Sequence, residues 1–216
     1  MKNFYKDITK GKSYFYYYGW TIIAFLLGFY LIAFIIFQAM FFVPRTNRIE
    51  IFIAAQGIND AEYNVKLQKE FEEQGLMQVD IYSYYIDDAN VYNYFSANGE
   101  KADFIIFPES VLNDMQDYVK DSYFELSTLV DGCSSINDYE SFKYEEKPYG
   151  IKIFDGVNEA YNTQHHFTDL IEFTKEGKTN ESYYLLVDNE SPNFNKENGN
   201  TLGYSVLEYL LSSMLG

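Results

Sequence analysis

An uncharged run near the N-terminus constrains this sequence more than any other feature. Residues 20–43 carry no charged side chain over 24 positions, and only Thr21 and Gln38 interrupt the apolar surface. A helix of this length reaches about 36 Å, which exceeds the roughly 30 Å hydrocarbon core of a bilayer. The core helix of a soluble protein normally keeps one polar face. The run therefore predicts a membrane-spanning helix.

The residues after this run indicate an anchor that stays on the protein. A secretory signal peptide has an apolar stretch of about 7–15 residues followed by small residues at a cleavage site. Here the run is longer, and residues 41–45 read Phe-Phe-Val-Pro-Arg. A lipid anchor would need a cysteine directly after the run, but the only cysteine is Cys133. We therefore expect the helix itself to hold the protein in the membrane.

The flanking charges predict which side of the membrane each part occupies. Four lysines and one acid precede the run, whereas two arginines follow it closely: Lys2, Lys6, Lys10, Lys12 and Asp7 before, Arg45 and Arg48 after. Cations favour the cytoplasmic side, and the tyrosines before Trp20 are typical of a headgroup layer. We expect a cytoplasmic segment 1–19, a transmembrane helix 20–43 and an extracytoplasmic domain 44–216 in the cell membrane.

The predicted extracytoplasmic domain is strongly acidic. The whole chain has 16 basic and 32 acidic residues; the first 44 residues hold four and one of these, which leaves the rest with 12 and 31 and a net charge of −19. Such a surface repels nucleic acid, so DNA and RNA are excluded as partners. The single Cys133 cannot form an internal disulfide, and we interpret it as a small buried apolar residue.

Alternating strand and helix patterns predict an α/β fold. Residues 48–55, 77–86 and 102–107 are rich in β-branched and aromatic side chains, as strands are. Helix formers fill residues 61–74, which end at Gly75, and residues 89–97. Asn59 or Asp60 is the predicted cap of the first of these helices, and Asp87 is that of the second. A βαβαβ run normally winds into a parallel sheet flanked by helices, so we expect a Rossmann-like three-layer domain with a mostly parallel sheet.

In the second half of the domain, the alternation of strand and helix patterns is less regular. Residues 109–120 favour a helix, residues 121–149 a loop or small insertion, and residues 151–154 a short strand. A helix over 157–166, a buried strand over 183–187 and a final helix over 201–215 complete the expectation.

The sequence carries no motif that specifies catalysis, a metal or a cofactor. Phosphate loops, paired CxxC and HExxH are all missing, and Gly203 to Leu207 lacks the second glycine of a nucleophile elbow. His165 and His166 are neighbours on a predicted helix, so their side chains point about 100° apart. Acidic turns at 87–88 and 188–190 lack the spacing of a calcium loop. We expect a protein that is not an enzyme.

Several segments give the domain a family resemblance. ADFIIFPESVL (102–112), FELSTLVD (124–131), YGIKIFDG (149–156) and YYLLVDNES (183–191) follow the βαβαβ opening. The domain resembles a reduced form of the extracytoplasmic solute-binding proteins of the type 2 periplasmic-binding fold, which deliver solutes to ABC importers. It is also similar to uncharacterised membrane-anchored proteins of Gram-positive bacteria. Members are about twice as long and bind solute between two lobes, but only about 30 loosely patterned residues stand here in place of the second lobe.

The resemblance and the strand ends together suggest where a ligand would bind. In open parallel sheets, ligands lie outside the carboxyl ends of the strands. The candidate ligand-binding residues are Gln56, Glu109, Ser110 and Tyr149.

The sequence leaves two functions open. Loss of the second lobe favours an accessory or interaction protein that docks onto a membrane partner such as an ABC transporter. The alternative is a tethered solute-binding protein that captures a small polar solute at the strand ends.

Overall fold

The computed structural model describes residues 2–55, 57–58, 63–85, 90–158, 160, 171–172, 181–195 and 199–214. The chain divides into two compact units, Met1–Phe42 and Val43–Gly216. The second unit is called the α/β domain below.

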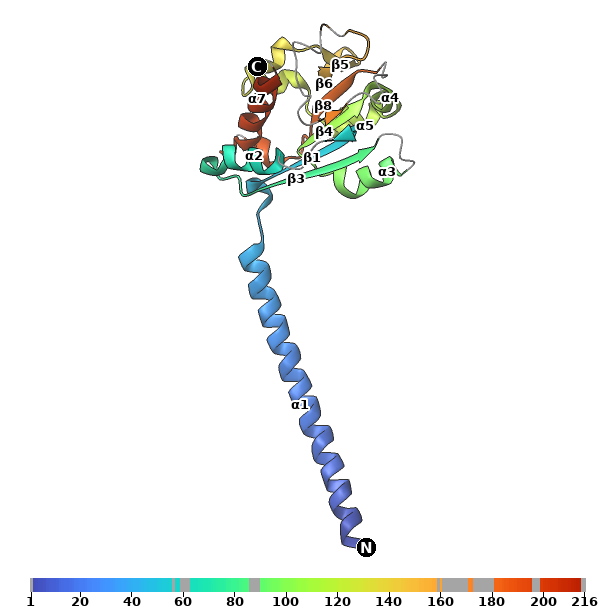
Figure 1. Ribbon diagram of the computed structural model, residues 1–216, viewed down its shortest axis with the longest axis vertical. Helices are drawn as coiled ribbons and strands as arrows, with labels where there is room; N and C mark the ends of the chain where they lie inside the picture. The colour runs from blue at the N-terminus through green and yellow to red at the C-terminus, as the bar shows by residue number, and fades with distance from the viewer. Residues whose placement is uncertain are drawn as a thin grey trace. The chain divides into compact units, whose positions relative to one another are not determined.

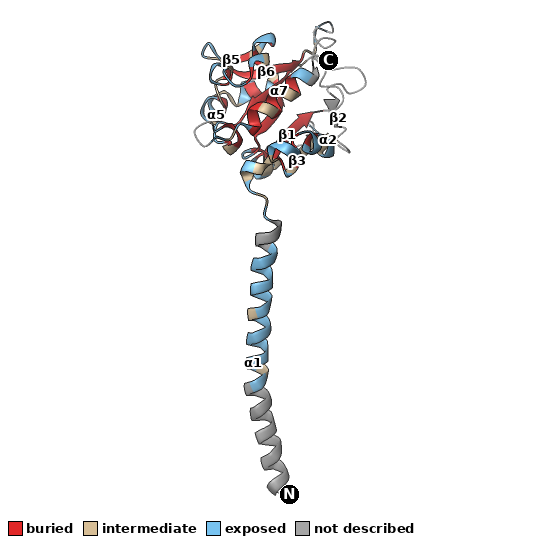
Figure 2. Cartoon of the chain, turned by 90° about the vertical axis from the view of Figure 1, so that its left-hand side faces the viewer, coloured by how far each residue is buried: buried red, intermediate tan, exposed pale blue. Residues whose placement is uncertain are grey.

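The first unit is one continuous helix, α1 (Lys2–Phe41). Its segment Tyr18–Phe37 has a mean hydropathy of 2.5, and within the described residues it is the one helix long and apolar enough to cross a membrane. None of that segment is buried against protein, as its exposed colouring in Figure 2 shows. An apolar helix long enough to cross a membrane is thus present near the N-terminus.

The α/β domain alternates short helices with strands. Its strands are β1 (Arg48–Ala55), β2 (Gly57–Ile58), β3 (Gln78–Tyr85), β4 (Phe104–Pro108), β5 (Ser141–Tyr144), β6 (Lys147–Phe154), β7 (Ile171–Glu172) and β8 (Tyr183–Val187). Its α-helices are α2 (Tyr63–Glu70), α3 (Val91–Tyr94), α4 (Glu109–Asp114), α5 (Gln116–Ser122) and α7 (Leu202–Met214). Single turns of other helix types are η1 (Arg45–Asn47), η2 (Glu72–Gln74), η3 (Phe95–Gly99), η4 (Leu126–Thr128), η5 (Ser134–Asp138) and η6 (Pro192–Phe194).

Six strands form the central sheet in the order β3-β1-β4-β8-β6-β5 (Figure 1). The opening βαβαβ prediction is confirmed, because β1 pairs in parallel with both β3 and β4. The expectation of a mostly parallel sheet is wrong, since β4–β8, β8–β6 and β6–β5 are all antiparallel. The fold is a mixed α/β domain, because β8 inserts in the opposite direction between β4 and β6.

A tight hairpin between β5 and β6 accounts for one of the antiparallel pairs. Its turn is Glu145-Glu146, and both residues have positive φ, 49° and 65°. A two-residue turn of this kind joins antiparallel strands only. The predicted loop over 121–149 therefore contains a strand and the start of another. No turn is predicted at this position, because two glutamates replace the usual Asn-Gly or Asp-Gly pair.

Helices cover both faces of the sheet and bury two separate clusters. One cluster joins alternate strand residues such as Ile51 and Ile53 to α2 and α7. The other joins Phe52 and Ala54 to α3, η3, α4 and α5. Figure 2 shows the strands buried at the centre of the domain. Successive residues on β1 alternate between the two clusters, as a strand covered on both faces requires.

The structure has helices in most of the predicted segments, but their bounds differ from the predicted ones. Gly75 ends the first helical region in the left-handed conformation, with φ of 93°. The predicted helix over 109–120 is broken at Met115, whose backbone is not helical. Val157 and Asn158 lie outside any helix, and their backbone N–H groups donate to Asp155 Oδ1. The caps Asn59, Asp60 and Asp87 and the pair His165 and His166 fall outside the described residues.

Candidate functional site

Glu109 and Ser110 lie together at the carboxyl end of β4. Glu109 is half-buried, and its backbone N–H donates to the carbonyl of Ser182, just before β8. The exposed Ser110 hydroxyl donates to Glu181 Oε2 at 3.0 Å. Antiparallel pairing brings the start of β8 beside the end of β4. Two of the four predicted ligand residues therefore share one edge of the sheet with Glu181 and Ser182.

Tyr149 lies at the opposite end of the sheet from Glu109. Ile106 of β4 and Ile151 of β6 both pair with Leu185, so Tyr149 stands level with the amino end of β4. Its side chain is 4% exposed and packs in the second cluster. The structure does not bring Tyr149 to the edge that holds Glu109 and Ser110. Gln56 falls outside the described residues.

Lys152 is a partly buried lysine near the sheet edge that holds Glu109 and Ser110, and the sequence alone does not predict it as a site residue. The Lys152 ammonium lies 2.9 Å from Glu140 Oε2 and 2.6 Å from Asp155 Oδ2, and its side chain is 11% exposed. Burial opposes the charged form of Lys152, but the hydrogen bonds to Asp155 and Glu140 outweigh it and raise its pKa. Lys152 is therefore a fixed cation. No sequence motif marks it, because Glu140 and Lys152 meet only through the β5–β6 pairing.

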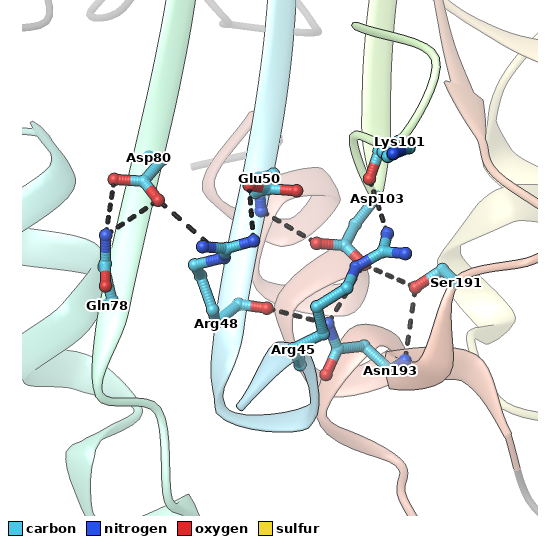
Figure 3. Close-up of polar contacts among 9 residues, drawn as sticks. All are labelled: Arg45, Arg48, Glu50, Gln78, Asp80, Lys101, Asp103, Ser191 and Asn193. Atoms are coloured by element: carbon cyan, nitrogen blue, oxygen red, sulfur yellow. Dashed lines mark hydrogen bonds and ion pairs between the residues drawn. The ribbon is translucent and has the colours of Figure 1, made fainter. Parts of the chain in front are cut away.

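The opposite, amino-terminal edge of the sheet holds a buried polar network (Figure 3). Asp103 is 2% exposed and accepts three hydrogen bonds. The donors are the Glu50 backbone N–H at 2.8 Å, the Ser191 hydroxyl and the Asn193 side-chain amide at 3.0 Å. The Asn193 amide also donates to the carbonyls of Arg45 and Arg48. This network ties the start of the α/β domain to β1, β4 and η6.

Arg48 extends this network toward β3. Its guanidinium lies 2.9 Å from Glu50 Oε1 and 3.9 Å from Asp80 Oδ2. Gln78 donates its amide to both Asp80 oxygens, as Figure 3 shows. Burial raises the pKa of Glu50, and the charge of Asp103 adds to this, although Arg48 works against it. The charged side chains of Arg48, Glu50 and Asp80 are paired with one another, so we assign these contacts a role in holding β1 and β3 together.

Asp188 is a further buried acid close to the network. It is 6% exposed, and its Oδ1 accepts from the backbone N–H of Glu190. Burial raises the pKa of Asp188 to about 6. Within the described residues, no group of three or more His, Cys, Asp or Glu side chains could hold a metal ion.

Cys133 lies in the first cluster and is 1% exposed, so its predicted burial is confirmed. Burial raises the pKa of the Cys133 thiol strongly, and its hydrogen bond with Glu208 and the negative charge of Glu208 raise it further. A thiol held in its protonated form is a poor nucleophile. The geometry therefore gives Cys133 a packing role.

The outer side of β3 is the longer of the two edges of the six-stranded sheet that pair with no other described strand. β3 pairs with β1 over eight residues, and its other side pairs with no described strand (Figure 1). Met77 before it is 56% exposed and Tyr85 at its end is 68% exposed. Its sequence, QVDIYSYY, has no proline or lysine and a single charge. Natural proteins usually protect such an edge with those residues.

The comparisons with known proteins identify no family. No family model matches the sequence, and no curated protein matches it significantly. The structure is similar to a solved one, described as the crystal structure of an N-glycan transport solute binding protein from Streptococcus pneumoniae. The two share 15% sequence identity with a TM-score of 0.37, over 51% of this chain and 26% of that chain. This chain spans about a quarter of the length of that protein.

Proposed function

We propose that this chain is a membrane-anchored, non-catalytic interaction module whose α/β domain receives an extended segment of a partner on the outer edge of β3. The observation that carries the proposal is the eight-residue strand from Gln78 to Tyr85, whose outer side pairs with no other described strand. An added strand gains backbone hydrogen bonds along such an edge, and side-chain contacts on alternate residues give specificity.

The partner that fits this edge is a basic segment of another membrane protein. The α/β domain has a net charge of −19, so two copies repel each other, whereas a basic partner is attracted. Only residues 42–47 separate α1 from β1, so the domain is tethered closely to its anchor. A transport protein of the same membrane, such as an ABC transporter, is the partner class that this proposal favours.

Site-specific photo-crosslinking in intact cells tests the docking edge. A photoreactive phenylalanine at Met77 or Tyr85 should give a discrete adduct with a membrane protein, and the linked peptide should be basic. The matched control is Val157, which is 82% exposed but belongs to no strand. Equal adducts from all three positions, or none from Met77 and Tyr85, would contradict docking at β3.

The anchor and its orientation have their own test. Deleting residues 20–43 should release the chain from the membrane fraction, because no other described helix can span a bilayer. Protease added to intact cells should remove the C-terminal part. Protection of the C-terminal part in intact cells, with cleavage after lysis, would place the α/β domain in the cytoplasm instead.

A second function is a tethered solute-binding protein, and the carboxyl-end edge favours it. Glu109, Ser110 and Lys152 supply fixed polar groups at the edge where sheets of this kind bind ligands. A bound solute would raise the melting temperature of the full chain in detergent. Glu109→Gln and Ser110→Ala should reduce that response. A flat response to a panel of sugars, amino acids and peptides would remove this alternative.

A further inference from the structure

A polar hollow of about 480 Å³ lies where α4 meets α5, and its lining includes neither a residue of β3 nor Lys152. Residues 113–118 and Tyr144 line it. The hollow includes the break at Met115, whose backbone leaves the helical conformation between the two segments. Its volume falls in the range of small-molecule sites.

Two aromatic rings and two carboxylates face this hollow. Tyr118 and Tyr144 are half-buried, whereas Asp114 and Asp117 are exposed. The Tyr144 hydroxyl donates to Asp117 Oδ1 at 3.0 Å, which fixes the ring beside the carboxylate. No basic residue belongs to the lining, and neither aspartate takes part in an ion pair within the described residues. The hollow is therefore electronegative.

The ring of Tyr144 already faces a cation from the protein itself. Lys120 Nζ lies 6.0 Å from the ring centroid, and its charge is paired with Glu145 at 2.7 Å. That pair is neutral as a whole and leaves the charges of Asp114 and Asp117 uncompensated. Carboxylates beside tyrosine rings are the arrangement that recognises organic ammonium groups, because a weakly hydrated cation gains from both the negative charge and the ring faces.

We propose that this hollow binds a small organic ammonium ion. The net charge of −19 on the α/β domain raises the local concentration of cations and disfavours anionic ligands. Inorganic cations are strongly hydrated and gain little from the two rings. The proposal concerns a site separate from the docking edge, so either can fail without the other.

Isothermal titration of the full chain, in a non-ionic polyoxyethylene detergent, tests the site with choline as the probe. The matched control ligand is 3,3-dimethylbutan-1-ol, which has the shape of choline without its charge. Choline should bind with a Kd on the order of 1 mM, and the neutral alcohol at least tenfold more weakly. Equal binding of both compounds, or no choline binding, would overturn the proposal.

Substitutions distinguish the contribution of the two carboxylates to choline binding from that of the tyrosine rings. The double variant Asp114→Asn and Asp117→Asn should weaken choline binding at least tenfold while keeping an oxygen acceptor for the Tyr144 hydroxyl. Tyr144→Leu should weaken it as well, whereas Tyr144→Phe keeps the ring and should bind. Asp131→Asn, an exposed acid outside the hollow, is the control and should bind as the original chain does. Circular dichroism identifies any variant that fails to fold, and unchanged binding by the folded double variant would refute the site.

Discussion

Asn193 and Asp103, 90 residues apart in the sequence, are joined by a 3.0 Å hydrogen bond from Asn193 Nδ2 to Asp103 Oδ1. The same amide group donates to the carbonyls of Arg45 and Arg48. One fully buried side chain therefore connects the entry of the α/β domain, the start of β4 and η6. It is the point at which the network in Figure 3 is most sensitive to substitution.

Asn193→Asp should destabilise the α/β domain by about 3–5 kcal/mol, because it places an unpaired buried charge against the Asp103 carboxylate. Asn193→Ala should cost less, about 1–3 kcal/mol, since it leaves acceptors without a donor but adds no charge. Urea unfolding followed by circular dichroism measures both. Asn93→Asp, on an exposed residue of α3, is the control and should be nearly neutral. Equal effects of the two aspartate substitutions would show that the network contributes little.

Asp188 should make the α/β domain less stable as pH rises through the range of about 4 to 6. Burial raises its pKa from an ordinary 3.8 to about 6, so the folded state binds a proton that the unfolded state has already lost in this range. The free energy of unfolding should therefore fall as pH rises, by at most about 3 kcal/mol.

Asp188→Asn tests this directly, because the amide oxygen can still accept from the Glu190 N–H. We expect the variant to be more stable than the original chain at pH 7 and similar to it at pH 4. Urea unfolding at pH 4, 5.5 and 7 provides the comparison. If the variant lost stability equally at every pH, the charge of Asp188 would not be the cause.

The α/β domain should need residues 43–47 for full stability. Arg45 Nη2 donates to the carbonyl of Lys101 at 2.6 Å, and Asn47 Nδ2 donates to that of Gly75 at 2.8 Å. The carbonyl of Asn47 also accepts from the Met77 N–H. The unfolding free energy of fragment 43–216 should exceed that of fragment 48–216 by about 1.5–4.5 kcal/mol, since each of the three hydrogen bonds contributes about 0.5–1.5 kcal/mol. Identical unfolding curves would make these contacts dispensable.

Glu146→Gly should stabilise the α/β domain by up to about 1 kcal/mol. Glu146 has φ of 65°, a conformation that costs an ordinary residue energy and glycine very little. Differential scanning calorimetry should show a higher melting temperature. Glu70→Gly, at the end of α2, is the opposite control and should lower it by reducing helix propensity. A lower melting temperature for Glu146→Gly would indicate that the glutamate side chain itself stabilises the hairpin.

Local patterns in the sequence were sufficient for the apolar helix and for most of the sheet. The run 20–43 has no charge, and β1, β3, β4 and β8 are short stretches of branched or aromatic residues. Such signals depend on neighbours close in the chain, so they can be read without knowing the fold. The parallel direction of β1, β3 and β4 follows from the same patterns, because strands joined by helices pair in parallel. Their order in the sheet does not follow from these patterns.

Only the tertiary structure decided the direction of the remaining strands and the grouping of the polar residues. β8 pairs antiparallel with β4, although the two strands lie far apart in the sequence. The Glu145-Glu146 turn has positive φ at both residues but contains neither asparagine nor glycine. The sequence predicts Tyr149 at the same ligand site as Glu109, yet the strand register places Tyr149 at the other end of the sheet. Asp103 and Asn193 meet across 90 residues. Contacts of this range are set by packing and strand register, which leave no local trace in the sequence.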